Sequence, residues 1–382
     1  MGTFIISDLK KSTIKLKRGE ILKTKEKNKN NRGFKIFLVF LVLSILILAD
    51  ENIQKAIINR IKKVNIGIKS IDFKVSESIP ISGEILDIGN YKGIVLWDGK
   101  KLIKIDNNGD IIKEKEFNLE DTHLHMGQDR IYVYEKPSGD IYILNEEMET
   151  IDKIKLEGRI ENIVESFDYI LVHTKEDYGE SLKILNKTGQ IIENIITENR
   201  NILTYSTNKE GNKYTISTLS FEDTTIRSQI QTFEIGGQSI FDHSFKDEII
   251  LYTKYISQDK LIIMTDKNIY CISGDEVIWN KSYESLKDIY VDNEDIYLLY
   301  SNSLDVITEN GDIKYNYSFS EEYRKILVYD KFLIAYGEEY IIGIMEQEEV
   351  FKYNAESTIL KAIKDGKKLM ILYSDKIDLA TF

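Results

Sequence analysis

The sequence is poor in cysteine, proline, histidine and tryptophan, and several of these shortages exclude something. Its 382 residues include 1 Cys, 2 Pro, 4 His and 2 Trp. The lone Cys271 excludes an intramolecular disulfide, and the apolar stretch NIYCISG around it predicts a small buried side chain. Hydrophobic residues nevertheless make up 42% and aromatic residues 10% of the chain, so most of it is globular rather than disordered.

Motifs of known enzyme chemistry are also missing. The chain contains no G-x-S-x-G for a nucleophilic serine, no H-E-x-x-H for zinc, and no phosphate-loop or dinucleotide-binding glycine motif. Carboxylates are so abundant, with 63 Asp and Glu, that no pair of them stands out for acid–base catalysis. We therefore predict no catalytic residue, no cofactor and no enzyme activity.

One pattern suggests a metal, the pair His123 and His125 in the stretch THLHMG. Side chains alternate along a strand, so the two imidazoles share one face. We expect this strand to be the innermost of its repeat, where both rings can point to the centre of the fold and begin a zinc or copper site. A third ligand is not evident, and a pair of satisfied polar side chains is the competing interpretation.

One long apolar run, FKIFLVFLVLSILILA, occupies residues 34–49. It is slightly shorter than a comfortable membrane span, but flanking residues lengthen it, and we predict an uncleaved transmembrane signal-anchor helix over residues 34–50. A cleavable signal peptide is the alternative. The 33 residues before the run and the missing A-x-A pattern argue against cleavage.

Charge sets the expected orientation of this anchor. Residues 1–49 contain 11 of the 51 basic residues and 3 of the 63 acidic residues. Residues 50–382 therefore carry 40 basic and 60 acidic residues, a balance of −20. The basic tail, residues 1–33, is expected to stay in the cytoplasm and the C-terminal bulk outside the cell membrane. Residues 51–69 have isoleucines at helical spacing and predict an amphipathic stalk. The acidic bulk makes nucleic acid a poor partner.

From residue 70 to residue 382 the chain repeats. Runs of alternating apolar residues, rich in Tyr and β-branched side chains, are separated by turns of Gly, Asn and Asp. The turns before each fourth strand recur every 36 to 48 residues. Four strands per period of about 40 residues predict an all-β fold, a β-propeller of four-stranded blades, whereas a single sandwich would show no such period. These turns centre on Gly109, Glu147, Gly189, Gly237, Gly274, Gly311 and Gln347.

The two ends of the repeat region complete one another. The last repeat stops after three strands at Phe382, and SIDFKVS (residues 70–76) matches the pattern of a fourth strand. An N-terminal strand in the last blade would close the ring without a free edge and bring the count to eight blades. Seven blades remain the alternative if the long repeat over residues 200–246 is wrongly divided.

The stretch IDNNGDIIKEKEF (residues 105–117) resembles the start of a calcium-binding loop. An EF-hand that starts at Asp106 needs Gly at its sixth position and Glu at its twelfth, but Ile111 and Phe117 stand there. Asn and Gly between two alternating apolar runs instead predict a hairpin turn, because both tolerate positive φ.

Together the basic tail, the single anchor and the Ile- and Tyr-rich repeats resemble a family of membrane-anchored β-propellers of unknown function from low-GC Gram-positive bacteria. The chain is more distantly similar to quinoprotein-like and WD-repeat propellers, but Trp97-Asp98 is the sole Trp-Asp pair and only Trp97 and Trp279 occur. This departure argues against a quinone cofactor. We expect a binding or scaffold module of the cell envelope, with an envelope protein or cell-wall polymer as partner. The alternative is an extracytoplasmic carbohydrate hydrolase or lyase acting at the channel mouth.

Overall fold

The computed structural model describes residues 70–382, except 223–224, 293, 330–331 and 346. All of them belong to the second of two units, Ile68–Phe382. The predicted tail, anchor and stalk, residues 1–33, 34–50 and 51–69, lie outside the described residues. In the described part of the chain, no helix is long and apolar enough to cross a membrane.

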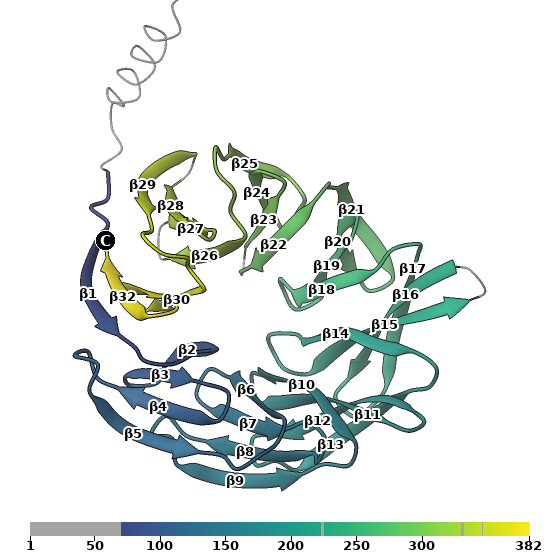
Figure 1. The fold of residues 1–382 in the computed structure, drawn as a ribbon. Helices are drawn as coiled ribbons and strands as arrows, with labels where there is room; N and C mark the ends of the chain where they lie inside the picture. The colour runs from purple at the N-terminus through teal and green to yellow at the C-terminus, as the bar shows by residue number, and fades with distance from the viewer. Residues whose placement is uncertain (1–69, 223–224, 293, 330–331, 346) are drawn as a thin grey trace, which may run out of the picture. The chain divides into compact units, whose positions relative to one another are not determined.

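Eight antiparallel four-stranded sheets form this unit, and Figure 1 shows them arranged as the blades of a ring. Blades 1 to 3 consist of β2 (Asp87–Asn90), β3 (Ile94–Trp97), β4 (Lys101–Ile105), β5 (Ile111–Glu116); β6 (Thr122–Met126), β7 (Ile131–Glu135), β8 (Asp140–Leu144), β9 (Thr150–Lys155); and β10 (Arg159–Ser166), β11 (Tyr169–Glu176), β12 (Gly179–Asn186), β13 (Ile191–Thr197).

The remaining blades repeat this order. Blades 4 to 6 consist of β14 (Asn201–Thr207), β15 (Lys213–Glu222), β16 (Thr225–Glu234), β17 (Ser239–Lys246); β18 (Ile250–Tyr255), β19 (Lys260–Thr265), β20 (Asn268–Ser273), β21 (Glu276–Ser282); and β22 (Leu286–Val291), β23 (Asp295–Tyr300), β24 (Ser303–Thr308), β25 (Ile313–Ser318). Blades 7 and 8 consist of β26 (Lys325–Tyr329), β27 (Phe332–Tyr336), β28 (Tyr340–Met345), β29 (Glu348–Asn354); and β30 (Lys361–Asp365), β31 (Lys368–Leu372), β32 (Lys376–Thr381), β1 (Lys74–Pro80).

The predicted eight-bladed ring closed by an N-terminal strand is therefore confirmed, and the seven-bladed alternative is wrong. The long fourth repeat forms one blade, because β15 and β16 are simply longer, at 10 residues each. Strand β1 pairs antiparallel with β32, with Ile79 opposite Ile377. The closing strand starts later than the predicted residues 70–76. Ile71 N donates instead to Val350 O, and Phe73 stacks on Phe351, so the chain first contacts blade 7.

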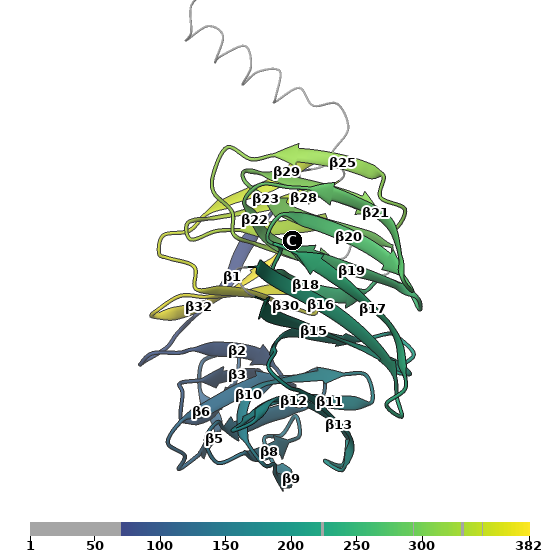
Figure 2. The same cartoon turned by 90° about the vertical axis from the view of Figure 1, so that its right-hand side faces the viewer.

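Burial explains why each sheet has this strand order. In most blades the second and third strands are largely apolar and buried on both faces, and β3 is buried at all four of its residues. Fourth strands such as β5 are exposed at every second residue or more and lie at the rim of the ring (Figures 1 and 2). Apolar faces of adjacent sheets pack on one another, as where Tyr132 of blade 2 shares a core cluster with Ile160 and Val172 of blade 3.

The predicted turn at residues 106–110 is confirmed. Gly109 has φ of 88°, and Asp106 uses its Oδ1 to accept the backbone N–H of Asn108 (2.8 Å) and of Asp110 (3.0 Å). The carboxylate that resembled a calcium ligand thus holds its own turn. A Cβ on Gly109 would lie 2.8 Å from Cγ2 of Ile79 in β1, so the glycine also lets this turn approach the neighbouring blade closely.

Candidate functional site

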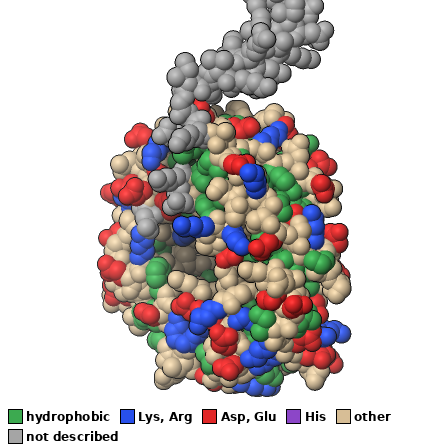
Figure 3. All heavy atoms as spheres, turned by 90° about the vertical axis from the view of Figure 1, so that its left-hand side faces the viewer, with side chains coloured by type: hydrophobic (Ala, Val, Ile, Leu, Met, Phe, Trp, Pro, Cys, Tyr) green, Lys and Arg blue, Asp and Glu red, His purple; other side chains and the backbone are tan. Residues whose placement is uncertain are grey.

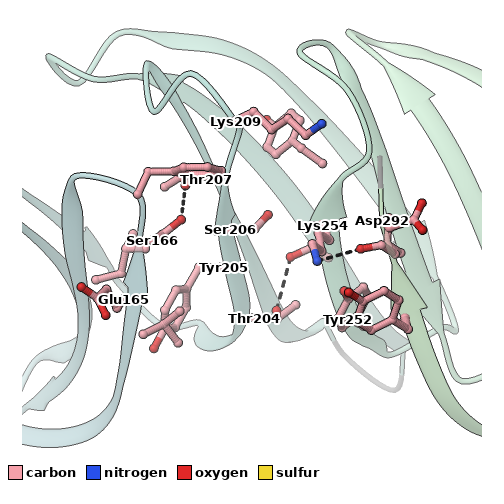
Figure 4. A pocket seen from close by; sticks show the side chains of 17 residues that line it. Glu165, Ser166, Thr204, Tyr205, Ser206, Thr207, Lys209, Tyr252, Lys254 and Asp292 are labelled. Carbon is pink, nitrogen blue, oxygen red and sulfur yellow. Dashed lines mark hydrogen bonds between the residues drawn. The ribbon is translucent and has the colours of Figure 1, made fainter. Parts of the chain in front are cut away.

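The two faces of the ring differ in the connections that they carry. Because each blade is antiparallel, the turns from first to second and from third to fourth strands lie at one end of every sheet. We call this end the cavity face. A cavity of about 860 Å³, the inner cavity, opens there among the ends of the innermost strands β10, β14, β18 and β22 (Figure 4). Its volume lies in the upper part of the range typical of small-molecule sites.

A chain of polar contacts joins the innermost strands of neighbouring blades around the whole ring. Each of the eight blade interfaces has one: Tyr91 OH to Gly127 O, Glu165 N to His125 Nε2, Ser166 to Thr207, Thr204 to Thr253, Lys254 Nζ to Val291 O, Ile326 N to Asp288 Oδ2, Tyr329 OH to Gly366 O, and Lys361 to Asp87. The bonds from Ser166 to Thr207, from Thr204 to Thr253 and from Lys254 to Val291 fix side chains that line the cavity.

Aromatic rings form part of the cavity wall. Tyr252 and Tyr290 line it from β18 and β22, and Phe167 lines it from the turn between β10 and β11. Phe167 is 52% exposed and has φ of 46°, the left-handed conformation that a bulky residue rarely adopts. Its exposed apolar side chain in this conformation makes Phe167 a candidate for ligand contact.

Positive charge is in excess among the groups open to the cavity. Lys254 Nζ donates to Val291 O at 2.8 Å and lies 5.5 Å from the centre of the Tyr290 ring. Although this side chain is open to the cavity, desolvation in the hollow lowers the pKa of Lys254. Within the described part of the chain, neither Lys254 nor Lys209 has a carboxylate in ion-pair contact.

The two carboxylates of the lining differ in their surroundings. Glu165 turns away from the cavity in Figure 4. Its carboxylate pairs with Lys187 and accepts the backbone N–H of Gln128 at 2.8 Å. Asp292 stays near Lys254, whose pKa it raises against the larger effect of burial. The Oδ1 of Asp292 accepts the backbone N–H groups of Glu294 and Asp295, both at 2.9 Å, but no cation pairs with it in the described part of the chain. Two lysines thus face one carboxylate without a cationic partner, a net positive site on a strongly acidic domain.

The structure places the two candidate histidines on β6, the innermost strand of blade 2, as predicted. His123 Nε2 contacts Asp121 Oδ1 at 2.8 Å, and His125 Nε2 accepts the backbone N–H of Glu165 at 3.2 Å. Burial lowers the pKa of His125, so this ring is held neutral. No third ligand joins them: among the residues that the structure describes, no group of three or more His, Cys, Asp or Glu could hold a metal ion.

Other carboxylates near the centre of the ring already have cationic partners. Asp87 pairs with Lys361, and Asp288 pairs with Lys325 at 3.1 Å. The innermost strands are thus not lined by Ile, Ser and Thr alone, and the hydrolase or lyase alternative stays a prediction. Cys271 is fully buried, as predicted, and burial raises the pKa of its thiol to about 11.

The lining of the inner cavity was missed from the sequence. Its residues lie on four blades, up to 128 positions apart, and nothing in one repeat marks them. One signal was available, the turn ESFDYI, which has Phe167 where turns usually have Gly, Asn or Asp.

The fold and the inner cavity define the chain as a β-propeller with a polar and aromatic site at the centre of one face. Residues 72–381 match the model of a family of unknown function, DUF5711. The chain belongs to this family, and the predicted resemblance to propellers of unknown function is confirmed. No curated protein sequence matches this chain.

Solved structures confirm the distant similarity to quinoprotein-like and WD-repeat propellers. BamB from Moraxella catarrhalis superposes with a TM-score of 0.57 at 10% identity, covering 81% of this chain and 100% of that one. Sqt1 from Chaetomium thermophilum has a TM-score of 0.55 at 8% identity, covering 82% and 99%. At these identities the likeness shows the fold alone.

Proposed function

We propose that this chain is a membrane-tethered binding module of the bacterial cell envelope, without catalytic activity of its own. In this proposal, residues 34–50 cross the cell membrane, residues 1–33 stay in the cytoplasm, and the propeller stands outside on residues 51–69. The partner is an envelope protein or a cell-wall polymer, bound on the cavity face. The β-propeller fold is commonly a binding or scaffold module, which supports this role.

The observation that carries the proposal is the inner cavity. It combines an exposed phenyl ring in a strained turn, two lysines without ion pairs in the described part of the chain, and a wall fixed by bonds between blades. The side of the ring shown in Figure 3 has acidic and basic side chains interspersed, as expected of a solvated surface. We therefore place the partner on the cavity face rather than on this side of the ring.

Location is tested by labelling a thiol in intact cells. Cys271 is buried, so an Asp275→Cys variant has one accessible thiol, in an exposed turn of the propeller. A membrane-impermeant maleimide should label this variant in intact cells and leave the parent protein unlabelled. Labelling that requires broken cells would contradict the proposed orientation.

Binding is tested by photo-crosslinking with the full chain in its own membrane. A photoreactive amino acid at Lys209 places the probe at the inner cavity, and the same amino acid at Lys155 places it on the outer strand β9. We expect a defined adduct from position 209 and none from position 155. Equal adducts from both positions, or none from either, would overturn the binding role on this face.

A further inference from the structure

We propose that the inner cavity binds a saccharide that carries an anionic group, with Phe167 and Tyr290 against the sugar and Lys254 on the anion. This inference rests on the proposed binding role and deepens it, because it names the chemical class of the ligand. Three independent features of the cavity support it: its aromatic rings, its hydroxyl groups and its charge.

The aromatic rings fit the apolar face of a sugar. The face of an aromatic ring is electron-rich and attracts polarised C–H bonds, which pyranose rings present on one side. Phe167 and Tyr290 are 52% and 36% exposed and belong to blades 3 and 6, so they line the cavity from its two ends. In the corresponding turns of blades 1 and 4, the exposed positions include Lys92 and Lys209 rather than an aromatic residue. Phe167 is thus not a requirement of the turn.

Hydroxyl groups supply the polar part of the wall. Ser166, Thr204, Thr207 and Thr253 line the cavity and are already paired with one another across the blade interfaces. Ser206 also lines it, and its buried Oγ has no hydrogen-bond partner in the described part of the chain. A buried hydroxyl without a partner costs free energy, and a ligand rich in hydroxyls can both donate to it and accept from it.

Charge selects an anionic sugar over a neutral one. Lys254 and Lys209 face the cavity, Asp292 is the one lining carboxylate without a cationic partner in the described part of the chain, and Glu165 is neutralised by Lys187. Lys254 Nζ donates to one carbonyl, Val291 O at 2.8 Å, and has no carboxylate in ion-pair contact in the described part of the chain, so an anion can join it. A sugar carboxylate or sugar phosphate would supply this charge, and both are tested below.

Calorimetric titration of the full chain in detergent micelles is the test. The probes are trigalacturonate, glucose 6-phosphate, neutral maltotriose, and citrate as an anion without a sugar ring. We expect trigalacturonate or glucose 6-phosphate to bind at least tenfold more tightly than maltotriose, and citrate to bind no better than maltotriose. The stronger of the two anionic sugars identifies the source of the charge.

Two variants assign the contacts. Lys254→Met keeps an unbranched side chain without the charge. It should weaken binding of the anionic sugar at least tenfold and leave binding of maltotriose unchanged. Phe167→Asn should weaken binding of both the anionic sugar and maltotriose. Lys153→Met is the matched control, since Lys153 also lies over a tyrosine ring, at 4.6 Å from Tyr142, but on the outer strand β9. It should bind like the parent, and thermal unfolding should show all three variants folded.

Each result decides for or against the inference. Absence of binding by both anionic sugars overturns it, as does binding that Lys254→Met and Phe167→Asn leave unchanged. Tighter binding of citrate than of the sugars would assign the cavity to simple anions and also overturn it. If crosslinks from position 209 are retained alongside any of these results, the binding role stands and only the sugar as ligand is overturned. If the crosslinks and the binding of anionic sugars are both absent, the binding role and the sugar are both overturned.

Discussion

Ser78 Oγ donates a hydrogen bond to Oδ1 of Asp378, across 300 residues of sequence. Asp378 is completely buried in β32, and its other oxygen lies 3.0 Å from the ammonium of Lys376. This contact joins the first strand of the propeller to the last, so the closure of the ring depends on polar as well as apolar groups. A closed ring leaves no sheet edge free for another chain to pair with.

The closing strand should contribute strongly to stability. Ile79 of β1 is 2% exposed and packs among Ile377, Leu379 and Leu96 of blades 8 and 1. We expect Ile79→Ala to lower the free energy of unfolding by about 2–5 kcal/mol, because it removes buried methyl groups and leaves a cavity. Urea unfolding followed by circular dichroism measures this loss.

The control for the closing strand is Lys74→Ala, at an exposed position of the same strand. This change should alter the free energy of unfolding by no more than about 0.5 kcal/mol. Losses of equal and small size in both variants would show that β1 does not hold the ring.

A buried lysine should hold blade 3 together. Lys183 is 5% exposed, and its ammonium donates to Glu157 O (3.0 Å), Thr174 Oγ1 (2.8 Å) and Glu176 Oε1 (2.6 Å). Lys183→Met leaves these acceptors buried without their partner, and we expect it to cost about 3–5 kcal/mol. Lys155→Met, on the exposed outer strand β9, should be nearly neutral in the same urea titration.

The same lysine gives the protein a pH dependence. Its hydrogen bond lowers the pKa of Glu176, so this contribution to stability is complete above the ordinary glutamate pKa of about 4.3. It is lost as the pH falls through the lower pKa of the folded protein. The difference in stability between the parent and Lys183→Met should therefore shrink as the pH is lowered below about 4. A difference that stays constant down to pH 2 would contradict this assignment.

Much of the fold could be predicted because β-strands and tight turns are local. Alternation of apolar side chains and the turn residues between them predicted turns at Gly109, Gly189 and Gly274, and these turns do join the third and fourth strands of their blades. The closing strand was misplaced because Ile71 and Phe73 alternate as a strand does, yet they contact blade 7. The alternating pattern is the same for a strand of blade 8 and for a segment that contacts blade 7, and only the neighbours in the folded structure distinguish the two. In the turn after β8, the positive φ falls on Met148 rather than on a glycine, and its fully buried side chain offsets the strain.

The inner cavity could not be predicted for a different reason. Lys254 and Tyr252 sit in a strand that reads like every other first strand, and their importance comes from the bend of the ring that brings β10, β14, β18 and β22 together. The histidine pair, in contrast, was found because it is rare. Its neighbours are Asp121 and a backbone N–H, neither of which the spacing of the pair reveals.

A buried histidine should make stability fall in mild acid. His173 Nε2 lies 3.0 Å from Glu180 Oε2, and burial lowers the pKa of His173 despite this carboxylate. The unfolded chain then binds the proton more readily, so the stability is complete above the ordinary histidine pKa of about 6.5 and is lost as the pH falls below it. His173→Gln does not titrate and should flatten the stability profile between pH 7 and pH 5. An unchanged slope would assign the pH dependence to other groups.

Phe167 should trade stability for binding. Its left-handed φ of 46° costs about 1–2 kcal/mol in a residue with a Cβ, and asparagine tolerates this conformation better. We therefore expect Phe167→Asn to raise the free energy of unfolding by about 0.5–1 kcal/mol, since the half-exposed ring contributes little packing. Asp168→Asn, at the next position of the turn, should stay within about 0.5 kcal/mol of the parent. A marked loss of stability in Phe167→Asn would show that the ring is held for packing, whereas a gain together with lost sugar binding would show that it is held for the ligand.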